Sequence, residues 1–534
     1  MAETKRKYPV GIQSFEKIRR YGYIYVDKTE LIYKMITEGN PYFLSRPRRF
    51  GKSLLVSTLE ALFEGKRELF EEMTLEDGIV QPQLYIAKTN WKWETYPVFH
   101  FDFSKDLMNI EQLDNLIDDA LSGYEHQYGI TPNKPDTNLR LSNLVIAAHK
   151  QTGNRAVILV DEYDKLMLHH VGDKVQQETV RARFQNLFSP LKDLDDHLRF
   201  VFITGISKFS QMGVFSTLNQ LDNISMKANY DSICGITEQE LTTVFDQDIR
   251  QLSQRLGVTS EEALKELKDT YDGYHFSSGL TDIYNPFSLM NAFKSGEISS
   301  YWFDSATPSA LISILKKMPA LELTDIEGRS YPDTMFNLSF DTYDSPLPVL
   351  YQSGYLTIKD CKRVNKMNMY QLGFPNSEVR TGFADCLYQV VNPVNGIDNN
   401  KAVLLNAYND FWENNELPKF IEAIKAFFAG VPYQLDNKNE HHYHALLYTL
   451  LTAFGADVSA EESSAQGRSD IVLRMPKTIY ILEIKYNGTV DKALQQIDDR
   501  DYAGKYRLDS RPVVNVALNF SSETRNISEW GVRC

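Results

Sequence analysis

The segment of residues 45–53, Ser-Arg-Pro-Arg-Arg-Phe-Gly-Lys-Ser, constrains the fold more than any other part of the chain. It follows an apolar run at residues 42–44 and precedes apolar residues at helical spacing in residues 54–63. Strand, glycine-containing turn, Lys-Ser and helix is the order of a phosphate-binding loop, where backbone N–H groups and the positive end of a helix face the anion. The pattern predicts that Lys52 reaches the β- and γ-phosphates of a nucleotide and that the Ser53 hydroxyl binds Mg²⁺.

The loop departs from the general motif G-x-x-x-x-G-K-[ST] at one position. The chain has Arg46 where the motif has its first glycine, whereas the second glycine is present as Gly51. Pro47 fixes φ at about −65° and Arg46 lacks the freedom of glycine, so we expect a looser wrap around the β-phosphate. Arg48 and Arg49 either supply charge to the phosphates or are solvated. An ordinary strand-to-helix turn is the alternative, and residues further along the chain decide between the two.

The segment of residues 156–160, Ala-Val-Ile-Leu-Val, predicts a strand that is covered on both faces, as in a parallel sheet. Asp161 and Glu162 follow it directly. Because ligands of such sheets bind at the carboxyl ends of the strands, Asp161 is placed to hold Mg²⁺ and Glu162 to activate a water for attack on the γ-phosphate. The alternative is that both residues begin the next helix, since acidic residues favour helix N-termini.

A second apolar segment, residues 199–203, predicts a neighbouring buried strand that ends in Thr204. We expect Thr204, or Ser207 just beyond it, to contact the γ-phosphate. Strands that alternate with helical segments predict an α/β domain with a parallel sheet. The loop, the acidic pair and the polar strand end together favour binding of ATP with Mg²⁺ over the alternatives for each piece taken alone.

Short segments along nearly the whole chain resemble one family. They are Tyr8-Pro-Val-Gly-Ile-Gln-Ser-Phe15, Val26-Asp-Lys-Thr29, Arg46-Pro-Arg-Arg-Phe-Gly-Lys-Ser53, Val160-Asp-Glu-Tyr-Asp-Lys165, Thr204-Gly-Ile-Ser-Lys208, Tyr271-Asp-Gly-Tyr-His-Phe276, Tyr284-Asn-Pro-Phe287 and Ser353-Gly-Tyr-Leu356. Together they look like the AAA-ATPase-like family that carries a C-terminal PD-(D/E)XK nuclease-like domain. In that family the Arg-Pro-Arg-Arg-Phe form of the loop is usual, so the resemblance implies that Arg46 is no departure from the family pattern.

The patterns and the resemblance together predict an α/β protein of five parts. These are a P-loop AAA-like ATPase core with a parallel sheet (1–235), a helical lid (236–295), a winged-helix-like module (296–385), a helical connector (386–435) and a small α/β PD-(D/E)XK nuclease-like domain (436–534). Two capping boxes, Thr237-Glu-Gln-Glu240 and Thr259-Ser-Glu-Glu262, mark expected helix starts in the lid.

The winged-helix-like module is implied by the resemblance. Its sequence predicts helices mixed with short strands around residues 347–356 and 369–373. Lys362, Arg363 and Lys366 are candidates for contact with nucleic acid, although a solvated surface loop is the favoured interpretation of such a charge cluster.

Two apolar segments near the C-terminus, residues 469–473 and 479–485, predict a hairpin. The first carries Asp470, and the second carries Glu483 and Lys485, which share a face because they are two residues apart. This set resembles the nuclease triad, which implies that the two carboxylates bind Mg²⁺ and that Lys485 orients or polarises the attacking water. The alternative is a surface hairpin with alternating charges. Buried strands rarely carry charges that coordinate nothing, and this favours the metal site.

Further ligands of this site are less clearly indicated. The Ile484 carbonyl is expected to be a metal ligand, and Glu462 and Glu440 are weaker candidates for a fourth carboxylate. The histidines at 441, 442 and 444 lack a metal-ligand spacing and are expected on a helix surface.

Composition limits the protein class. A net charge of −14 argues against a surface that binds nucleic acid throughout, so any such contact needs a local basic patch. The four cysteines are scattered and are expected to be reduced structural thiols. The first residues lack a signal-peptide core and no apolar run approaches the about 18 residues that cross a membrane, so we expect a cytoplasmic protein without a membrane anchor.

The sequence therefore leads to two hypotheses. In the first, ATP binding and hydrolysis are coupled to a Mg²⁺-dependent nuclease that acts on DNA or RNA. In the second, the protein is an ATP-dependent switch or scaffold whose nuclease-like fold binds a partner without cutting. The triad favours the first hypothesis, and the acidic net charge favours the second. Assembly into an oligomer is left open.

Overall fold

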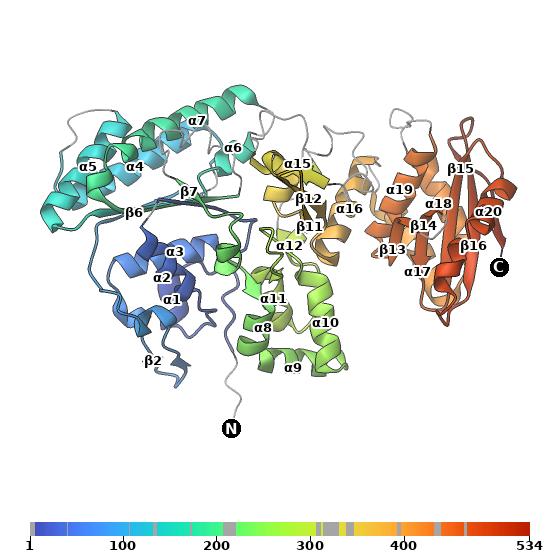
Figure 1. Ribbon diagram of the computed structural model, residues 1–534, viewed down its shortest axis with the longest axis horizontal. Coiled ribbons are helices and arrows are strands. Elements are labelled where there is room, and N and C mark those ends of the chain that lie inside the picture. The colour runs from blue at the N-terminus through green and yellow to red at the C-terminus, as the bar shows by residue number, and fades with distance from the viewer. Residues whose placement is uncertain are drawn as a thin grey trace. The chain divides into compact units, whose positions relative to one another are not determined.

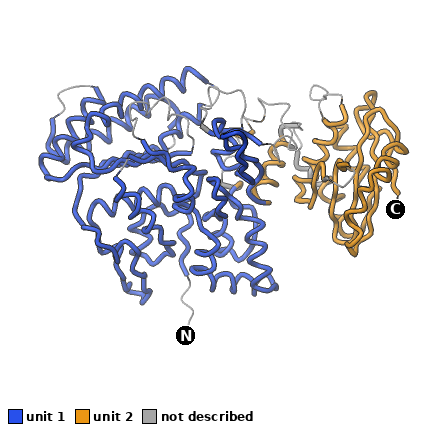
Figure 2. Tube along the Cα trace, viewed as in Figure 1, with its two compact units in different colours: residues 1–302, 330–376 blue, residues 303–329, 377–534 orange. Residues whose placement is uncertain are grey.

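The computed structural model describes residues 6–39, 41–105, 107–131, 136–170, 173–206, 221–305, 311–312, 315, 330–337, 347–391, 397–431, 439–463 and 467–533. The chain forms two compact units, Met1–Trp302 with Ser330–Asn376, and Phe303–Arg329 with Ser377–Cys534 (Figure 2). Among the helices so described, none is long and apolar enough to span a membrane.

A five-stranded parallel sheet is the centre of the first unit, with the strand order β4-β5-β6-β1-β7. The strands are β1 (Tyr42–Ser45), β4 (Val98–Asp102), β5 (Ala156–Asp161), β6 (Leu198–Gly205) and β7 (Asp222–Asn223). The predicted strands at residues 156–160 and 199–203 are β5 and β6, and every residue of β5 is buried. The prediction of an α/β domain with a parallel sheet is confirmed.

Helices cover both faces of this sheet (Figure 1). They are α1 (Phe15–Arg20), α2 (Thr29–Glu38) and α3 (Lys52–Phe63) on one face, and α4 (Ile110–Gln127), α5 (Thr137–Thr152) and α7 (Lys174–Phe188) on the other, with the short α6 (Lys165–His169) after β5. The second group packs its apolar side chains against β4, β5 and β6 in one core, which keeps the carboxyl ends of these strands in fixed positions.

A small helical group follows the sheet, within the residues expected to form a lid, and its role as a lid stays a prediction. It consists of α8 (Glu238–Val244), α9 (Asp246–Leu256), α10 (Ser260–Tyr271) and α11 (Pro286–Ser295), with the two-residue strands β8 (Ile236–Thr237) and β9 (Ile283–Tyr284). Both predicted capping boxes are present: Thr237 caps α8 with Glu240, and Thr259 caps α10 with Glu262. Apolar side chains of these helices form a core of their own.

The rest of the first unit contains a three-stranded antiparallel sheet in the order β10-β12-β11. Its elements are β10 (Ser330–Pro332), α15 (Leu347–Gln352), β11 (Thr357–Val364) and β12 (Met367–Gly373). The expectation of a strand around residues 347–356 is wrong, because residues 347–352 form the buried helix α15. A short apolar run that is buried on all sides has no periodicity to separate helix from strand. Lys362, Arg363 and Lys366 are exposed at the β11–β12 turn.

The second unit is built on a mixed five-stranded sheet in the order β13-β14-β15-β16-β17, in which only the β15–β16 pair is parallel. The strands are β13 (Val458–Ser463), β14 (Arg468–Arg474), β15 (Ile479–Tyr486), β16 (Val513–Ser521) and β17 (Asn526–Arg533), and the helices are α16 (Ser377–Val391), α17 (Ile397–Asn414), α18 (Leu417–Gly430), α19 (Glu440–Ala453) and α20 (Val490–Asp499). The predicted hairpin is β14–β15, which pairs Ile471 with Leu482. Helix α20 crosses between β15 and β16, a connection that parallel strands require.

Candidate functional site

The predicted phosphate-binding loop connects β1 to α3. Gly51 precedes the helix with φ +95°, a backbone conformation that residues with a side chain rarely adopt, which explains the glycine at this position. Lys52 is buried, and its Nζ donates hydrogen bonds to the carbonyl oxygens of Arg46 and Pro47, both at 3.0 Å. The ammonium therefore lies inside the curve of the loop, where a phosphate would meet it.

Arg46, which replaces the first glycine of the general motif, is a buried anchor of the loop. Its guanidinium donates to the carbonyl oxygens of Ser45 at 2.9 Å, Ser225 at 2.8 Å and Tyr230 at 3.0 Å. It also lies 4.1 Å from the centre of the Phe276 ring. Charged donors on three main-chain acceptors form strong hydrogen bonds, so the loop is tied to the chain that follows β7.

Aromatic and glycine residues from distant segments support the loop. The Phe50 ring contacts the edges of Tyr274 and Phe276, with ring centres 4.7 and 5.4 Å apart. Gly354 lies so close to Pro47 that a Cβ at that glycine would come within 2.6 Å of the proline Cβ. Two of the family segments, residues 271–276 and 353–356, are thereby explained as supports of the loop.

The two other loop arginines differ in environment. Arg49 is exposed, has φ +66°, and stacks its guanidinium 3.9 Å from the centre of the Phe287 ring of α11. Arg48 is half-buried, and its carbonyl oxygen accepts a hydrogen bond of 3.4 Å from Trp302 Nε1. Contact of either arginine with phosphate stays a prediction.

Asp161, the last residue of β5, lies at the carboxyl edge of the sheet beside Asp102 of β4. Burial raises the pKa of the Asp161 carboxyl, although a hydrogen bond from the Ser53 hydroxyl and the charge of Lys52 act in the opposite direction. Its Oδ1 is buried without a hydrogen-bond partner among the described residues. A buried, unpartnered carboxylate oxygen beside a serine hydroxyl fits the requirements of Mg²⁺.

Glu162 follows with φ +50° and is half-buried. Burial raises the pKa of its carboxyl, the charge of Lys52 lowers it, and the neighbouring Asp161 raises it further. The next helix, α6, begins only at Lys165, so neither acidic residue belongs to a helix. A carboxylate with a raised pKa at a strand end is suited to accept a proton from water.

The hydroxyl of Thr204 is buried and donates to the Leu44 carbonyl of the adjacent strand at 2.8 Å. Its hydrogen is therefore used within the sheet, while the oxygen retains lone pairs for a ligand. Ser207, the alternative candidate, lies outside the described residues. Contact of Thr204 with the γ-phosphate stays a prediction.

Asp164 is a buried carboxylate beside the candidate site for which the sequence motifs predicted no role. It is fully buried, and its two carboxylate oxygens accept a hydrogen bond from the Ile206 N–H at 3.2 and 3.1 Å. A Cβ at Gly205 would come within 2.6 Å of Asp164 Oδ1. This carboxylate therefore fixes the end of β6 against the segment that follows Asp161. Its place within the segment Val160-Asp-Glu-Tyr-Asp-Lys165 was the available signal.

The second site lies on the β14–β15 hairpin, where the structure brings the predicted triad together. Asp470 Oδ2 accepts a hydrogen bond of 2.7 Å from the Ile484 N–H. Lys485 Nζ lies 2.9 Å from Glu483 Oε1 and 3.1 Å from the Ile484 carbonyl oxygen. Two carboxylates, one carbonyl and one ammonium thus meet on neighbouring strands.

Burial dominates the electrostatics of this site. It raises the pKa of the fully buried Glu483, which the neighbouring Asp470 raises further and Lys485 lowers. Burial also raises the pKa of Asp470, although the Ile484 N–H and the charges of His444 and Lys485 oppose the shift. Glu483 Oε2 has no hydrogen-bond partner within the described ranges. A buried carboxylate pair with an unsatisfied oxygen fits a divalent cation with oxygen ligands.

Comparisons with known proteins assign a family to each of the two parts of the chain that carry these residues. Residues 9–215 match the family described as "Predicted AAA-ATPase", and residues 438–530 match the PD-(D/E)XK nuclease superfamily. An uncharacterized protein in the vnfD 5′ region of Azotobacter chroococcum mcd 1 is 32% identical over 538 residues, which cover 98% of each chain. The chain belongs to the AAA-ATPase-like family with a C-terminal PD-(D/E)XK nuclease-superfamily domain. Its first unit contains the ATPase-like part and its second unit the nuclease-fold part.

In the nuclease-fold part, Glu440 rather than Glu462 lies beside the triad. Glu440 is the first residue of α19; its Oε1 is 3.4 Å from Lys485 Nζ, and its Oε2 accepts a hydrogen bond of 3.3 Å from the Tyr486 N–H. Only the folded arrangement of α19 against β15 distinguishes these two carboxylates, because both precede the triad in the sequence.

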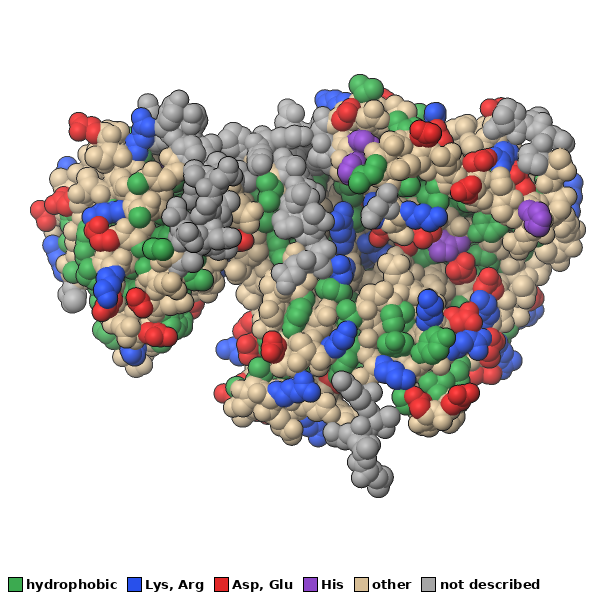
Figure 3. Space-filling view, turned by 180° about the vertical axis from the view of Figure 1, so that it is seen from behind, with side chains coloured by type: hydrophobic (Ala, Val, Ile, Leu, Met, Phe, Trp, Pro, Cys, Tyr) green, Lys and Arg blue, Asp and Glu red, His purple; other side chains and the backbone are tan. Residues whose placement is uncertain are grey.

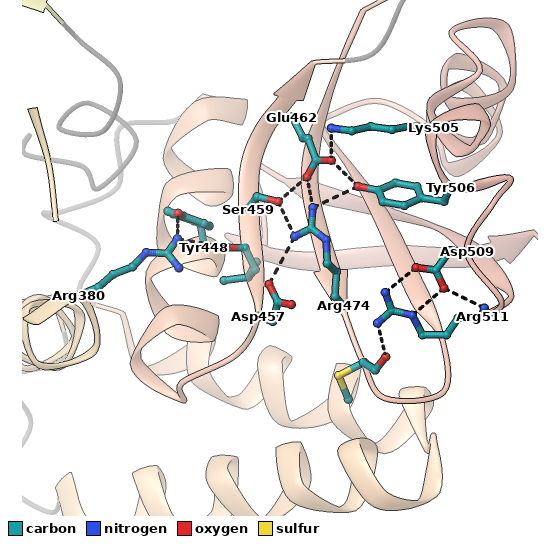
Figure 4. Close-up of polar contacts among 12 residues, drawn as sticks. Arg380, Tyr448, Asp457, Ser459, Glu462, Arg474, Lys505, Tyr506, Asp509 and Arg511 are labelled. Atoms are coloured by element: carbon teal, nitrogen blue, oxygen red, sulfur yellow. Dashed lines mark hydrogen bonds and ion pairs between the residues drawn. The ribbon is translucent and has the colours of Figure 1, made fainter. Parts of the chain in front are cut away.

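Glu462 belongs to a separate polar cluster (Figure 4). It forms ion pairs with Arg474 and Lys505 and accepts hydrogen bonds from the hydroxyls of Ser459 and Tyr506. Burial opposes its ionisation, but the hydrogen bonds from Lys505, Ser459 and Tyr506 lower its pKa to about 2. Both carboxylate oxygens of Glu462 therefore already have hydrogen-bond or ion-pair partners within the protein.

The expectation that the histidines at 441, 442 and 444 lie on a helix surface is wrong for two of them. His442 and His444 are buried, and only His441 is exposed. The reason is that α19 packs against α16 and against β13, β14 and β15, so most of its circumference is covered. His444 Nε2 lies 2.8 Å from the Asp470 carbonyl oxygen and thereby supports the strand that carries this candidate metal ligand.

Proposed function

We propose that this protein binds and hydrolyses ATP in its first unit and cleaves phosphodiester bonds of nucleic acid, DNA or RNA, in its second unit. The observation that carries the proposal is the meeting of Asp470, Glu483 and Lys485 on one hairpin of a chain that also contains a phosphate-binding loop. The two family matches support the same assignment of an ATPase to the first unit and a nuclease to the second.

At the ATPase site, Lys52 would contact the β- and γ-phosphates, and the backbone N–H groups at the start of α3 would face the same anion. Ser53 and Asp161 would hold Mg²⁺, which neutralises phosphate charge when bound. Glu162 would orient the attacking water and take its proton, and burial raises the pKa of its carboxyl, which makes it a better base.

At the nuclease site, Asp470, Glu483 and the Ile484 carbonyl would hold Mg²⁺, which polarises a phosphodiester when bound. Lys485 is held between Glu483 and Ile484, so its ammonium has a fixed position from which it can orient the attacking water. Glu440 approaches the same ammonium and would position it further. A lysine that is fixed by two acceptors loses little freedom when the substrate binds.

A second function is favoured by the distribution of charge. The net charge is −14, and on the face in Figure 3 the Lys and Arg side chains are interspersed with Asp and Glu. Such a surface attracts a polyanion weakly. In this alternative, ATP switches the binding of a partner to a nuclease fold that cuts nothing. Cytoplasmic location and assembly into oligomers stay predictions.

The experiment that separates the two functions uses the purified full-length protein. Single- and double-stranded DNA and RNA are incubated with Mg²⁺ or Mn²⁺, with and without ATP, and ATP hydrolysis is measured in the same samples. Cleavage that Asp470→Asn removes, while ATP hydrolysis continues, supports the nuclease. ATP hydrolysis without metal-dependent cleavage of any of these substrates supports the switch.

A further inference from the structure

Three carboxylates outside both proposed active sites converge in the helical group of the first unit. Glu238 lies in the first turn of α8, Asp272 caps the C-terminus of α10, and Asp282 immediately precedes β9. One oxygen of each lies within 4.8 Å of the others. Three acidic side chains at this spacing repel one another unless a cation lies between them.

Asp272 is the member of this cluster whose ionised carboxylate is the least favourable in the folded protein. Its side chain is only 2% exposed, and neither carboxylate oxygen forms a hydrogen bond of normal geometry with the described residues. Burial raises the pKa of its carboxyl to about 7, while the nearby Gly273 N–H and the charge of Lys268 oppose the shift and Asp282 adds to it. A buried carboxylate without hydrogen-bond donors is strongly unfavourable, so a bound cation would stabilise this position.

Tyr284 provides an independent indication of a ligand. The residue is completely buried, and its hydroxyl has no hydrogen-bond partner in the part of the chain that the structure describes. Burial raises the pKa of this phenol, and the charges of Asp272, Glu238 and Asp282 raise it further. Tyr284 is thus a second buried, unpartnered polar group of this helical group, and the charges of the three carboxylates act on its hydroxyl.

Two basic side chains already approach the cluster but do not satisfy it. Lys268 Nζ is 2.6 Å from Glu238 Oε2, 3.5 Å from Asp282 Oδ2 and 3.9 Å from Asp272 Oδ2. Its side chain is 43% exposed, so it can turn toward water when another cation takes its place. His275 Nε2 lies 2.7 Å from Asp282 Oδ1 and leaves the second oxygen of Asp282 directed to the cluster.

We propose that Glu238, Asp272 and Asp282 bind a divalent cation that prefers oxygen ligands, such as Mg²⁺ or Ca²⁺, and that this cation displaces the ammonium of Lys268. Carboxylate oxygens and water are among the ligand types that such cations select. The cation joins α8, the end of α10 and the start of β9. This is a third metal site, separate from the sites of the proposed ATPase and nuclease.

The position of this site links it to the phosphate-binding loop. Asp272 begins the segment whose Tyr274 and Phe276 pack against Phe50. A Cβ at Gly273 would come within 2.3 Å of the Pro375 carbonyl oxygen, so this segment has little freedom to shift. A cation that holds Asp272 therefore also steadies the aromatic support of the loop.

The test counts Mn²⁺ ions bound to the full-length protein without nucleotide, by the loss of the free-ion electron paramagnetic resonance signal. Wild type should bind one equivalent more than Asp272→Asn and one more than Asp282→Asn. Asp470→Asn should lose a different equivalent, so the double variant Asp272→Asn, Asp470→Asn should lose two. Equal binding by wild type, Asp272→Asn and Asp282→Asn would overturn the proposal and identify Asp272 as a protonated carboxyl.

Lys268→Gln is the informative companion variant. If a divalent cation displaces the ammonium, removal of the competing charge should tighten Mn²⁺ binding at this site by about tenfold, because a positive charge beside the site repels the incoming cation. If Lys268 is itself the permanent counter-ion, Lys268→Gln should lower the melting temperature and leave Mn²⁺ affinity unchanged, and the proposal fails.

Thermal unfolding shows whether a variant has lost metal binding only because it no longer folds. In EDTA, Asp272→Asn should melt at or above the temperature of wild type, because an uncompensated buried carboxyl has been removed. Ca²⁺ should raise the melting temperature of wild type more than that of Asp272→Asn. An equal rise in both proteins contradicts the site.

Discussion

Asp470 of β14 accepts a hydrogen bond of 2.7 Å from the main-chain N–H of Ile484 in β15. This bond fixes one carboxylate oxygen and leaves the other available, and it places Asp470 beside the carbonyl and carboxylate of the next strand. The candidate ligands are therefore held in position by the hairpin itself, before any metal or substrate binds.

Asp470→Ala and Lys485→Ala should both abolish cleavage for different reasons. Loss of Asp470 removes a metal ligand, so Mn²⁺ affinity and cleavage should fall together. Loss of Lys485 removes an ammonium that cannot ligate a cation, so Mn²⁺ binding should persist while the rate falls. Titration calorimetry with Mn²⁺ and a cleavage assay on the same preparations distinguish the two.

Glu462→Gln is the matched control for this pair, since it removes a partly buried carboxylate of the same sheet outside the site. It should weaken the cluster of Arg474 and Lys505 and leave Mn²⁺ binding unchanged. Loss of Mn²⁺ binding in Glu462→Gln would mean that the metal site has been misassigned.

The raised pKa of Glu483 predicts how pH affects the metal-free protein. Because burial raises the folded-state pKa above the ordinary value of 4.5, the folded state binds a proton more tightly than the unfolded state. Stability should be greatest below the unfolded pKa and should decrease as pH rises through the folded pKa. Unfolding in EDTA from pH 5 to pH 8, compared between wild type and Glu483→Gln, should show this decrease to be smaller in the variant. Parallel curves would contradict the assignment.

Lys52→Ala should abolish or severely weaken ATP binding and leave the fold intact. The physical reason is that one ammonium supplies most of the point charge that faces the β- and γ-phosphates. Titration calorimetry with ATP measures the loss, and an unchanged circular dichroism spectrum establishes that the protein is folded. An unchanged ATP affinity would exclude this loop as the nucleotide site.

Glu162→Gln should retain ATP and nearly stop its hydrolysis. The substitution removes the carboxylate that takes a proton from water and spares Asp161, so turnover should fall by about 10²–10⁴. Single-turnover hydrolysis alongside calorimetric binding separates the two effects. Hydrolysis at the wild-type rate would transfer the role of base to another residue.

Arg46→Gly restores the general phosphate-loop motif, yet it should destabilise the protein. It leaves buried carbonyls of Ser225 and Tyr230 without their charged donor, at about 1–3 kcal/mol for each. ATP binding should weaken or stay the same. Chemical denaturation measures the cost, and a variant as stable as wild type would show that Arg46 is no anchor.

The sequence could predict the candidate site residues that follow one another closely along the chain. Gly51, Lys52 and Ser53 are recognisable because a phosphate loop is a local structure, and Asp161 because a buried strand directly precedes it. The role of Arg46 could not be predicted in the same way. Its acceptors Ser225 and Tyr230 are 179 and 184 residues away, and only the fold brings them together.

The expectations drawn from the sequence are wrong in segments whose side chains are almost all buried. Residues 347–352 were expected near a strand but form α15, because every side chain in it is buried and no periodic pattern remains. His442 and His444 of α19 were misplaced on the surface for the same reason. The choice between Glu440 and Glu462 needed the packing of α19 on β15, which no local pattern contains.

The most direct test of the account is the initial rate of nucleic-acid cleavage by wild type and by Asp470→Asn, at saturating Mg²⁺ and with ATP present. The account predicts cleavage by wild type that chelation of the metal stops, and a rate for Asp470→Asn at the level of the blank. Equal rates in the two proteins would contradict the nuclease site on the β14–β15 hairpin.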